Sequence, residues 1–183
     1  EKAVAQQTRS TVITASRGTI YDRNGHPLAV SATAENVFVD PKGLQKYLDE
    51  QEEQGNTDVR DAEYIARGLS RILEVDEESI REKMEKTNSA YEIIKKRVDQ
   101  EIADEVRKFI NGEIDDEGNQ LTTVNDDGDT VLISDPDKSP VRVHGGYLEP
   151  DSKRYYPNGT LAANVLGFVN NDNIGGVGLE AKY

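Results

Sequence analysis

The 183-residue sequence contains no cysteine and no tryptophan, and it has only two histidines. Without cysteine the chain can form neither a disulfide framework nor a thiolate metal site. A zinc site needs three or four ligands, so we interpret His26 and His144 as surface residues. No stretch approaches the roughly 20 consecutive apolar residues of a bilayer-spanning helix. A disulfide scaffold, a zinc centre and a membrane span within this sequence are therefore excluded.

Basic residues are also scarce relative to acidic ones. The sequence has 22 Lys and Arg against 35 Asp and Glu, which gives a formal net charge of −13. This balance argues against a nucleic-acid-binding protein, because phosphate contacts need clusters of Lys and Arg. It also disfavours direct adhesion to an anionic lipid surface. The length is sufficient for one domain with a real core or for two small subdomains.

The two ends of the sequence carry no recognisable terminal signal. The sequence opens at Glu1 without the start of a signal peptide, and it stops at Tyr183. We expect both ends to be cuts in a longer chain.

The stretch RGTIYDRNGHPLA, residues 17–29, is the strongest local signal in the sequence. Two short apolar runs flank a turn that contains Asn24 and Gly25. Asn-Gly between apolar runs indicates a β-hairpin, because both residues tolerate positive φ. Pro27 has no backbone N–H, so we expect it at a strand edge or beside a β-bulge.

This stretch resembles the first motif of the class B penicillin-binding proteins, Arg-Gly-x-Ile-x-Asp-Arg-x-Gly-x-x-Leu-Ala, at every fixed position. Residues 154–183 resemble three later segments of the same family in the same order, namely Arg-x-Tyr-Pro, Ala-x-x-Val-Leu-Gly and Gly-x-x-Gly-Leu-Glu. The resemblance implies a structural role for the motif positions, which are Arg17, Gly18, Asp22, Arg23, Gly25, Arg154, Tyr156, Pro157, Gly167, Gly178 and Glu180.

Between the two motif groups, the sequence is mainly helical in character. Apolar residues recur there at helical spacing, which predicts amphipathic helices that pack into a core. Each predicted helix begins at an acidic or hydroxyl residue that can cap its first turn. The predicted N-terminal signals of the four helices are Asp40-Pro41, Thr57-Asp58, Asp76 and Asp99.

Strand signals are shorter and lie outside these helices. We predict extended segments at residues 11–14, 37–39 and 91–94. Residues 112–140 carry nine acids against one base, and turn signals there alternate with two β-prone runs. This pattern predicts an acidic β-hairpin. A calcium loop is the alternative, but the EF-hand spacing of acids around a glycine is absent.

These elements together predict an α+β fold with a discontinuous, β-rich base formed by both ends of the chain. We predict that residues 1–40 and 141–183 form this base. An α-rich head subdomain at residues 41–111 and an acidic β-hairpin insertion at residues 112–140 are inserted into it.

Catalytic motifs are missing from the sequence. A transpeptidase of the penicillin-binding family acylates a serine within Ser-x-x-Lys and also uses Ser-x-Asn and Lys-Thr-Gly. No serine in this sequence has a lysine three residues later, and the other two motifs are absent. Neither a Walker loop nor a Gly-x-Gly-x-x-Gly loop is present. We therefore expect no catalytic residue, no metal and no cofactor in this chain.

The resemblance implies that the chain is the non-catalytic pedestal of a membrane-anchored D,D-transpeptidase that cross-links peptidoglycan. It places this pedestal on the extracytoplasmic face of the bacterial cell membrane. The implied partners are the protein's own C-terminal transpeptidase domain, a membrane glycosyltransferase or division-type protein, and a second copy of the chain. Two alternatives remain open: a free-standing wall- or protein-binding module, and a small hydrolase that uses carboxylates.

The charged motif residues suggest how the two ends of the chain meet. We expect an ion-pair network there, because partly buried pairs can define a geometry even when they add little net stability. Such a network would hold the base together or pass motion to the catalytic domain. Its predicted members are Arg17, Asp22, Arg23, Arg154 and Glu180.

Overall fold

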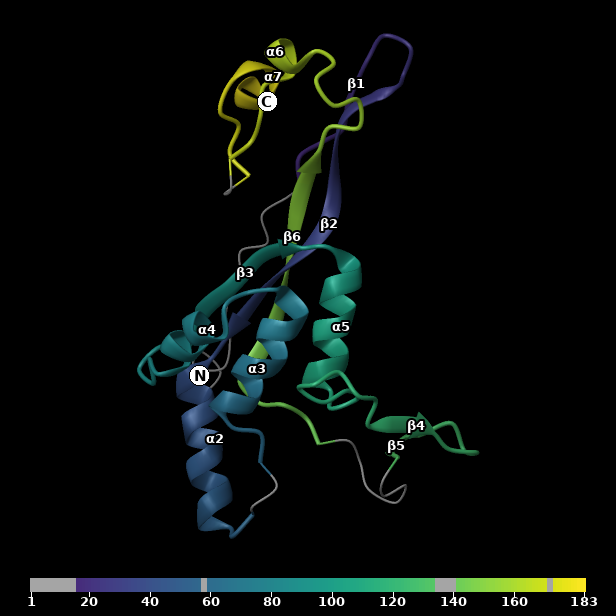
Figure 1. Ribbon diagram of the computed structural model, residues 1–183. Coiled ribbons are helices and arrows are strands. Elements are labelled where there is room, and N and C mark those ends of the chain that lie inside the picture. The colour runs from purple at the N-terminus through teal and green to yellow at the C-terminus, as the bar shows by residue number, and fades with distance from the viewer. Residues whose placement is uncertain (1–15, 57–58, 134–140, 171–172) are drawn as a thin grey trace, which may run out of the picture. The chain divides into compact units, whose positions relative to one another are not determined.

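The computed structural model describes residues 16–56, 59–133, 141–170 and 173–183. It combines helices with β-strands, so the predicted α+β class is confirmed (Figure 1). The extended segment predicted at residues 11–14 lies outside the described residues. None of the described helices has both the length and the hydropathy that a membrane-spanning helix requires.

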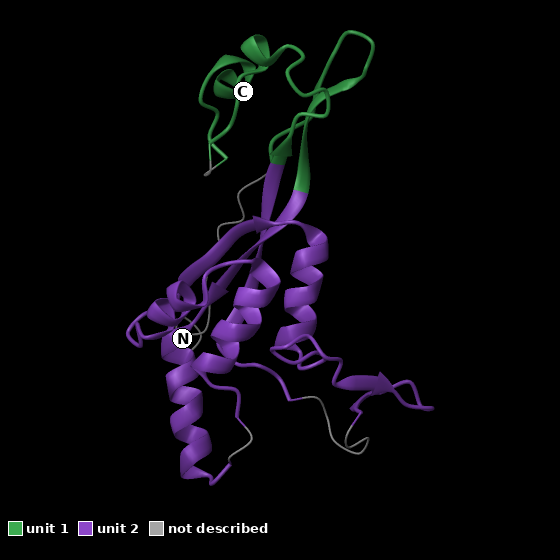
Figure 2. Ribbon diagram, in the orientation of Figure 1, with its two compact units in different colours: residues 1–32, 154–183 green, residues 33–153 purple. Residues whose placement is uncertain are grey.

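The chain divides into two compact units (Figure 2). The terminal unit contains the described residues up to Ala32 together with residues 154–183, so it is assembled from both ends of the chain. The central unit contains the described part of residues 33–153. Strands β2 (Pro27–Val39) and β6 (Gly146–Tyr155) contribute residues to both units.

Strand β2 pairs with each of the other strands of its sheet. It pairs antiparallel with β1 (Ile20–Tyr21) and with β3 (Glu92–Val98), and it also pairs with β6. The sequence predicted a hairpin over residues 17–29 and a separate strand at residues 37–39, and this division was wrong, because β2 runs unbroken from Pro27 to Val39. Residues 31–36 contain no large apolar side chain, so the sequence signal for a strand is weak there. Pairing with the neighbouring strands holds them extended regardless of this weak signal.

Helix α2 (Pro41–Glu53) begins where the sequence predicted. The Asp40 carboxylate accepts a hydrogen bond from the backbone N–H of Gly43 at 2.7 Å. Pro41 occupies the first helical position, where a backbone N–H has no intrahelical partner in any case. Gly55 follows the C-cap residue with a φ of +75°, the left-handed conformation that favours glycine.

Helices α4 (Glu77–Met84) and α5 (Gln100–Ile110) also begin directly after the predicted residues, Asp76 and Asp99. Asp76 caps its helix through a side-chain hydrogen bond. The Asp99 carboxylate makes no such bond and instead pairs with Lys153 at 3.1 Å. The start of α5 was therefore predicted correctly, whereas the capping hydrogen bond was not.

Helix α3 (Ala62–Leu73) begins later than predicted. The expected signal at residues 57–58 lies outside the described residues. Asp61 caps the helix, because its carboxylate accepts a hydrogen bond from the backbone N–H of Tyr64 at 2.9 Å.

The apolar faces of α3, α4 and α5 pack together with β2 and β3 in one core of the central unit (Figure 1). The apolar residues whose helical spacing is visible in the sequence therefore face this core. Its fully buried members include Val37, Val39, Ile65, Ala66, Leu69, Leu73, Ile80, Val106 and Phe109.

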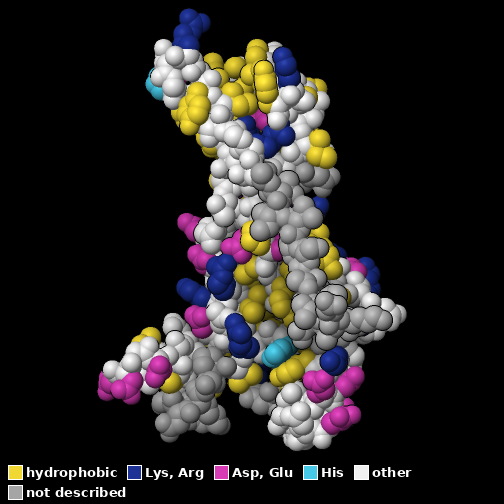
Figure 3. All heavy atoms as spheres, turned by 180° about the vertical axis from the view of Figure 1, so that it is seen from behind, with side chains coloured by type: hydrophobic (Ala, Val, Ile, Leu, Met, Phe, Trp, Pro, Cys, Tyr) yellow, Lys and Arg dark blue, Asp and Glu magenta, His cyan; other side chains and the backbone are white. Residues whose placement is uncertain are grey.

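Strands β4 (Thr122–Val124) and β5 (Thr130–Leu132) form a separate two-stranded antiparallel sheet in the central unit. Asn125 closes the turn between them, because its side-chain oxygen accepts hydrogen bonds from the backbone N–H groups of Asp127 and Asp129. Acidic side chains are visible on this hairpin at the lower left of Figure 3. The hairpin therefore presents negative charge to solvent.

A tight contact between α3 and α5 generates a prediction about stability. Gly68 lies against the ring of Phe109, and a Cβ atom at position 68 would overlap this ring. Gly68→Ala improves helix propensity by about 1 kcal/mol, but overpacking a core costs about 1–3 kcal/mol. We expect a net loss of about 1 kcal/mol in the free energy of unfolding, measured by urea denaturation.

A double-mutant cycle supplies the control for this prediction. In a Phe109→Leu background the smaller side chain makes room, so Gly68→Ala should be neutral or stabilising there. The same loss of stability in both backgrounds would contradict the steric explanation.

Candidate functional site

The first motif forms the β1–β2 hairpin, whose turn spans residues 22–26. The Asp22 carboxylate accepts hydrogen bonds from the backbone N–H groups of Asn24 at 2.8 Å and His26 at 2.9 Å. Gly25 has a φ of +83°, whereas Asn24 does not adopt a left-handed conformation. The turn is therefore a longer one closed by an aspartate, and not the two-residue Asn-Gly turn that the sequence suggested.

The second motif group contacts this hairpin next to Pro27. Pro27 is the first residue of β2 and lies beside a register shift in the β1–β2 pair, which confirms its predicted place at an irregularity. Its carbonyl oxygen accepts a hydrogen bond from the side-chain amide of Asn158 at 3.1 Å. Asn158 follows Pro157, which is itself exposed, so this bond connects the two motif groups.

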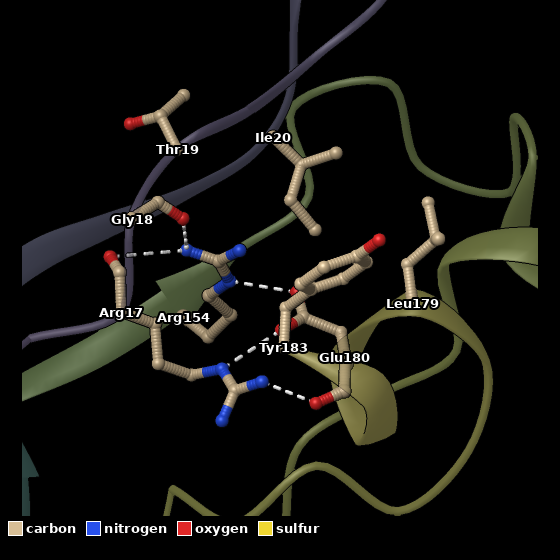
Figure 4. Close-up of a pocket in the computed structure, with 8 residues that line it drawn as sticks. All are labelled: Arg17, Gly18, Thr19, Ile20, Arg154, Leu179, Glu180 and Tyr183. Atoms are coloured by element: carbon tan, nitrogen blue, oxygen red, sulfur yellow. Dashed lines mark hydrogen bonds and ion pairs between the residues drawn. The ribbon is translucent and has the colours of Figure 1, made fainter.

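Three charged motif residues meet in the terminal unit, and we call them the Arg–Glu–Arg triad (Figure 4). Arg17 precedes β1, Arg154 lies in β6 and Glu180 lies in α7 (Gly178–Lys182). Arg17 Nε donates to Glu180 Oε2 at 2.9 Å, and Arg154 Nε donates to Glu180 Oε1 at 2.7 Å. The side chains of Arg154 and Glu180 are each only 1% exposed. Two guanidinium groups thus share one buried carboxylate.

Further nitrogen atoms of the two arginines bind backbone and side-chain oxygens. Arg154 Nη1 donates to the carbonyl oxygen of Gly18 at 2.9 Å and to Ser31 Oγ at 3.1 Å. Arg17 donates to the carbonyl oxygens of Asn173 and Glu180. The triad therefore ties the strand β2, the segment before β1 and the C-terminal segment to one another.

Tyr156, another motif residue, lies next to the triad. Its hydroxyl is buried and has no hydrogen-bond partner of good geometry among the described residues. Burial, together with the negative charge of Glu180, raises the pKa of Tyr156 above its ordinary value. The phenol therefore stays neutral and does not change the charge of the site.

Two motif glycines allow α6 (Ala163–Leu166) to lie directly against α7. Gly167 and Gly178 have φ values of +77° and +65°, which favour glycine. A Cβ atom at either position would overlap backbone atoms of the other segment, for example the carbonyl oxygen of Val177. This close approach fixes α7 and hence the position of the shared carboxylate.

The structure brings together three of the five residues expected in the ion-pair network, namely Arg17, Arg154 and Glu180. The other two lie in the hairpin turn. Asp22 uses its carboxylate for the nearby backbone N–H groups, which it reaches without any long-range contact. Arg23 is exposed and takes part in no ion pair of the described residues.

Sequence reasoning missed two contributors to the triad, Ser31 and Asn173. Ser31 supplies a hydroxyl from β2, and Asn173 supplies a backbone carbonyl oxygen. Neither has a motif of its own, and any residue can supply a carbonyl oxygen. No signal in the sequence could have identified them.

The buried carboxylate of Glu180 leads to a prediction about the stability of the terminal unit. Glu180→Gln leaves two guanidinium groups without their negative partner, which typically costs about 3–5 kcal/mol. We expect a loss of this size in the free energy of unfolding of the terminal unit, measured by denaturation followed through NMR signals of that unit. Glu50→Gln is the control, because Glu50 and Lys46 form an exposed pair that contributes less than about 1 kcal/mol. Equal losses for the two variants would contradict the role of the triad.

The structure of the hairpin turn leads to a prediction about the pKa of Asp22. Hydrogen bonds from the backbone N–H groups of His26 and Asn24 lower the pKa of Asp22. The folded-state pKa of Asp22 lies below the unfolded value of about 3.9. The ionised Asp22 carboxylate therefore stabilises the folded state above that value, and this stabilisation is lost as the pH falls through the folded pKa. A carbon-detected NMR titration of Asp22 should therefore give a midpoint below 3.9. A midpoint at or above this value would mean that the turn is not closed by the carboxylate.

Comparison with known proteins identifies a family. Residues 12–183 match the family described as the penicillin-binding protein dimerisation domain. The probable peptidoglycan D,D-transpeptidase PenA of Neisseria gonorrhoeae is 27% identical over 172 residues, which are 94% of this chain and 22% of that protein. The stage V sporulation protein D of Bacillus subtilis is 28% identical over 167 residues, 91% of this chain and 19% of that protein. The chain thus spans about a fifth of the length of these relatives.

Solved structures show the same fold. Penicillin-binding protein 2X from Streptococcus thermophilus has a TM-score of 0.53 at 22% identity, covering 93% of this chain and 22% of that one. A complex between penicillin-binding protein 2 and MreC from Helicobacter pylori has a TM-score of 0.51 at 20% identity, covering 93% of this chain and 28% of that one. The family match covers nearly the whole sequence and confirms the resemblance seen in the motifs: the chain belongs to the penicillin-binding protein dimerisation-domain family.

Proposed function

We propose that this chain is the non-catalytic pedestal of a longer penicillin-binding protein that cross-links peptidoglycan as a D,D-transpeptidase. The observation that carries the proposal is the family match over residues 12–183 in a sequence without the three acylation motifs. Relatives named peptidoglycan D,D-transpeptidases are four to five times longer than the matched segment, which leaves room for a catalytic domain. The pedestal would stand on the extracytoplasmic face of the bacterial membrane.

The proposed mechanism of the pedestal is mechanical. Residues 1–40 and 141–183 would form the base, residues 41–111 a head and residues 112–140 an acidic insertion. The terminal unit supports this division, because it is assembled from both ends of the chain and joined by the Arg–Glu–Arg triad. A buried triad resists deformation, since separating its members leaves a charge unpaired. The motif residues would thus hold the base rigid, so that the attached catalytic domain keeps a fixed distance from the membrane and a fixed orientation.

The pedestal would also contact partner proteins. Support comes from the family, which is described as a dimerisation domain, and from the structural neighbour that was solved as a complex with MreC. The proposed partners are the protein's own transpeptidase domain, a membrane glycosyltransferase or division-type protein, and a second copy of the chain.

Labelled penicillin tests whether the acylated serine lies outside this chain, in the rest of the longer protein. We expect the longer protein to be acylated and the isolated chain to remain unlabelled, because the nucleophilic serine lies outside the chain. Replacing this chain in the longer protein by a flexible Gly/Ser linker should leave acylation intact but abolish cross-linking in cells, measured by analysis of the wall peptides.

Two results would contradict the proposal. Covalent labelling of the isolated chain would show that the nucleophile lies within it. Normal cross-linking by the linker variant would show that the catalytic domain needs no pedestal.

A further inference from the structure

A cavity of about 320 Å³ lies beside the Arg–Glu–Arg triad in the terminal unit (Figure 4). Apolar side chains of Ile20, Leu179 and Tyr183 form its walls, and the backbone around Gly18 and the triad line the remainder. Its volume is at the lower end of the range of ligand pockets in proteins. The cavity is therefore large enough for a small organic molecule and too small for a folded partner.

One nitrogen of Arg154 faces this cavity without a partner. Arg154 Nε binds Glu180, and Nη1 binds the carbonyl oxygens of Arg17 and Gly18 and the hydroxyl of Ser31. Among the described residues, Nη2 has no hydrogen-bond acceptor, and it points toward the space between Ile20 and Tyr183 (Figure 4). The Arg154 side chain is 99% buried, since only 1% of it is exposed. A guanidinium nitrogen that opens onto a cavity can donate a hydrogen bond to a ligand bound there.

The charge of the site favours an anionic ligand. Two guanidinium groups face one carboxylate, so the triad carries a net positive charge in a buried place. The neighbouring Tyr156 stays neutral, because its pKa is raised by burial and by the charge of Glu180. An unbalanced buried charge is unfavourable, and a second carboxylate at Nη2 would balance it.

We propose that this cavity binds a carboxylate attached to a small apolar group. The carboxylate would accept a hydrogen bond from Arg154 Nη2, and the apolar group would lie between Ile20, Leu179 and Tyr183. A phosphate fits less well, because its oxygens need several charged donors and the walls formed by Ile20, Leu179 and Tyr183 are apolar. The proposal goes beyond the mechanical role of the pedestal and does not depend on it.

Ligand titration with the isolated chain tests the proposal. The probe is 3-phenylpropionate, and the matched neutral probe is 3-phenylpropanamide, which has almost the same shape. We expect saturable NMR shifts at Ile20, Leu179 and Tyr183, with a dissociation constant about tenfold lower for the carboxylate, because a hydrogen bond between charged groups is stronger than one to an amide. Absence of shifts, or equal affinities for the two probes, would overturn the proposal.

Three variants separate binding from folding. Tyr183→Ala removes one wall of the cavity and keeps all three members of the triad, and it should weaken binding of 3-phenylpropionate. Arg154→Lys should abolish the preference for the carboxylate, provided that its NMR spectrum shows a folded terminal unit. Arg23→Gln is the matched control, since it removes an exposed arginine outside the cavity and should leave the affinity unchanged. Unchanged affinity in Tyr183→Ala would overturn the proposed location.

The carboxylate could come from a free molecule or from another part of the longer protein, and the same titration distinguishes these sources. Binding of 3-phenylpropionate by both the isolated chain and the longer protein would indicate a free ligand. Binding by the isolated chain alone would indicate that a carboxylate of the longer protein already occupies the cavity.

Discussion

One carboxylate shared between two arginines holds the terminal unit together. Glu180 is almost fully buried, and its partners Arg17 and Arg154 lie 163 and 26 residues away in the sequence. A buried carboxylate is tolerated only when such partners compensate its charge. Moving one of these segments away would leave a buried charge without its partner. The triad therefore acts through the cost of separating its members more than through any gain in net stability.

The sequence predicted those parts of the fold that depend on short-range chemistry. Asp40 and Asp76 mark the starts of α2 and α4, because a capping residue acts on backbone groups within one helical turn. The motif comparison also named all three members of the triad. Their meeting could be expected from the two motif groups, but the hydrogen bonds to Ser31 Oγ and to backbone carbonyl oxygens could not.

Predictions failed where distant contacts or competing local bonds decide the structure. No strand was predicted at residues 31–36, yet pairing with neighbouring strands makes them the middle of β2. Asp22 looked like a member of the long-range network, but the backbone N–H groups of its own turn are closer and take its carboxylate. Helix α3 starts at Asp61, the second of two closely spaced aspartates that are equally good caps in the sequence.

The assembly of the terminal unit from both chain ends has a consequence for folding during synthesis. Residues 33–153 are contiguous, so the central unit can complete its contacts as soon as this stretch leaves the ribosome. Arg17 is made before the central unit and Glu180 after it, so the Arg17 guanidinium stays hydrated while the central unit is synthesised. Because contacts of such high sequence separation form slowly, the terminal unit is completed after the central unit, when α7 is captured by a segment that was translated before the central unit.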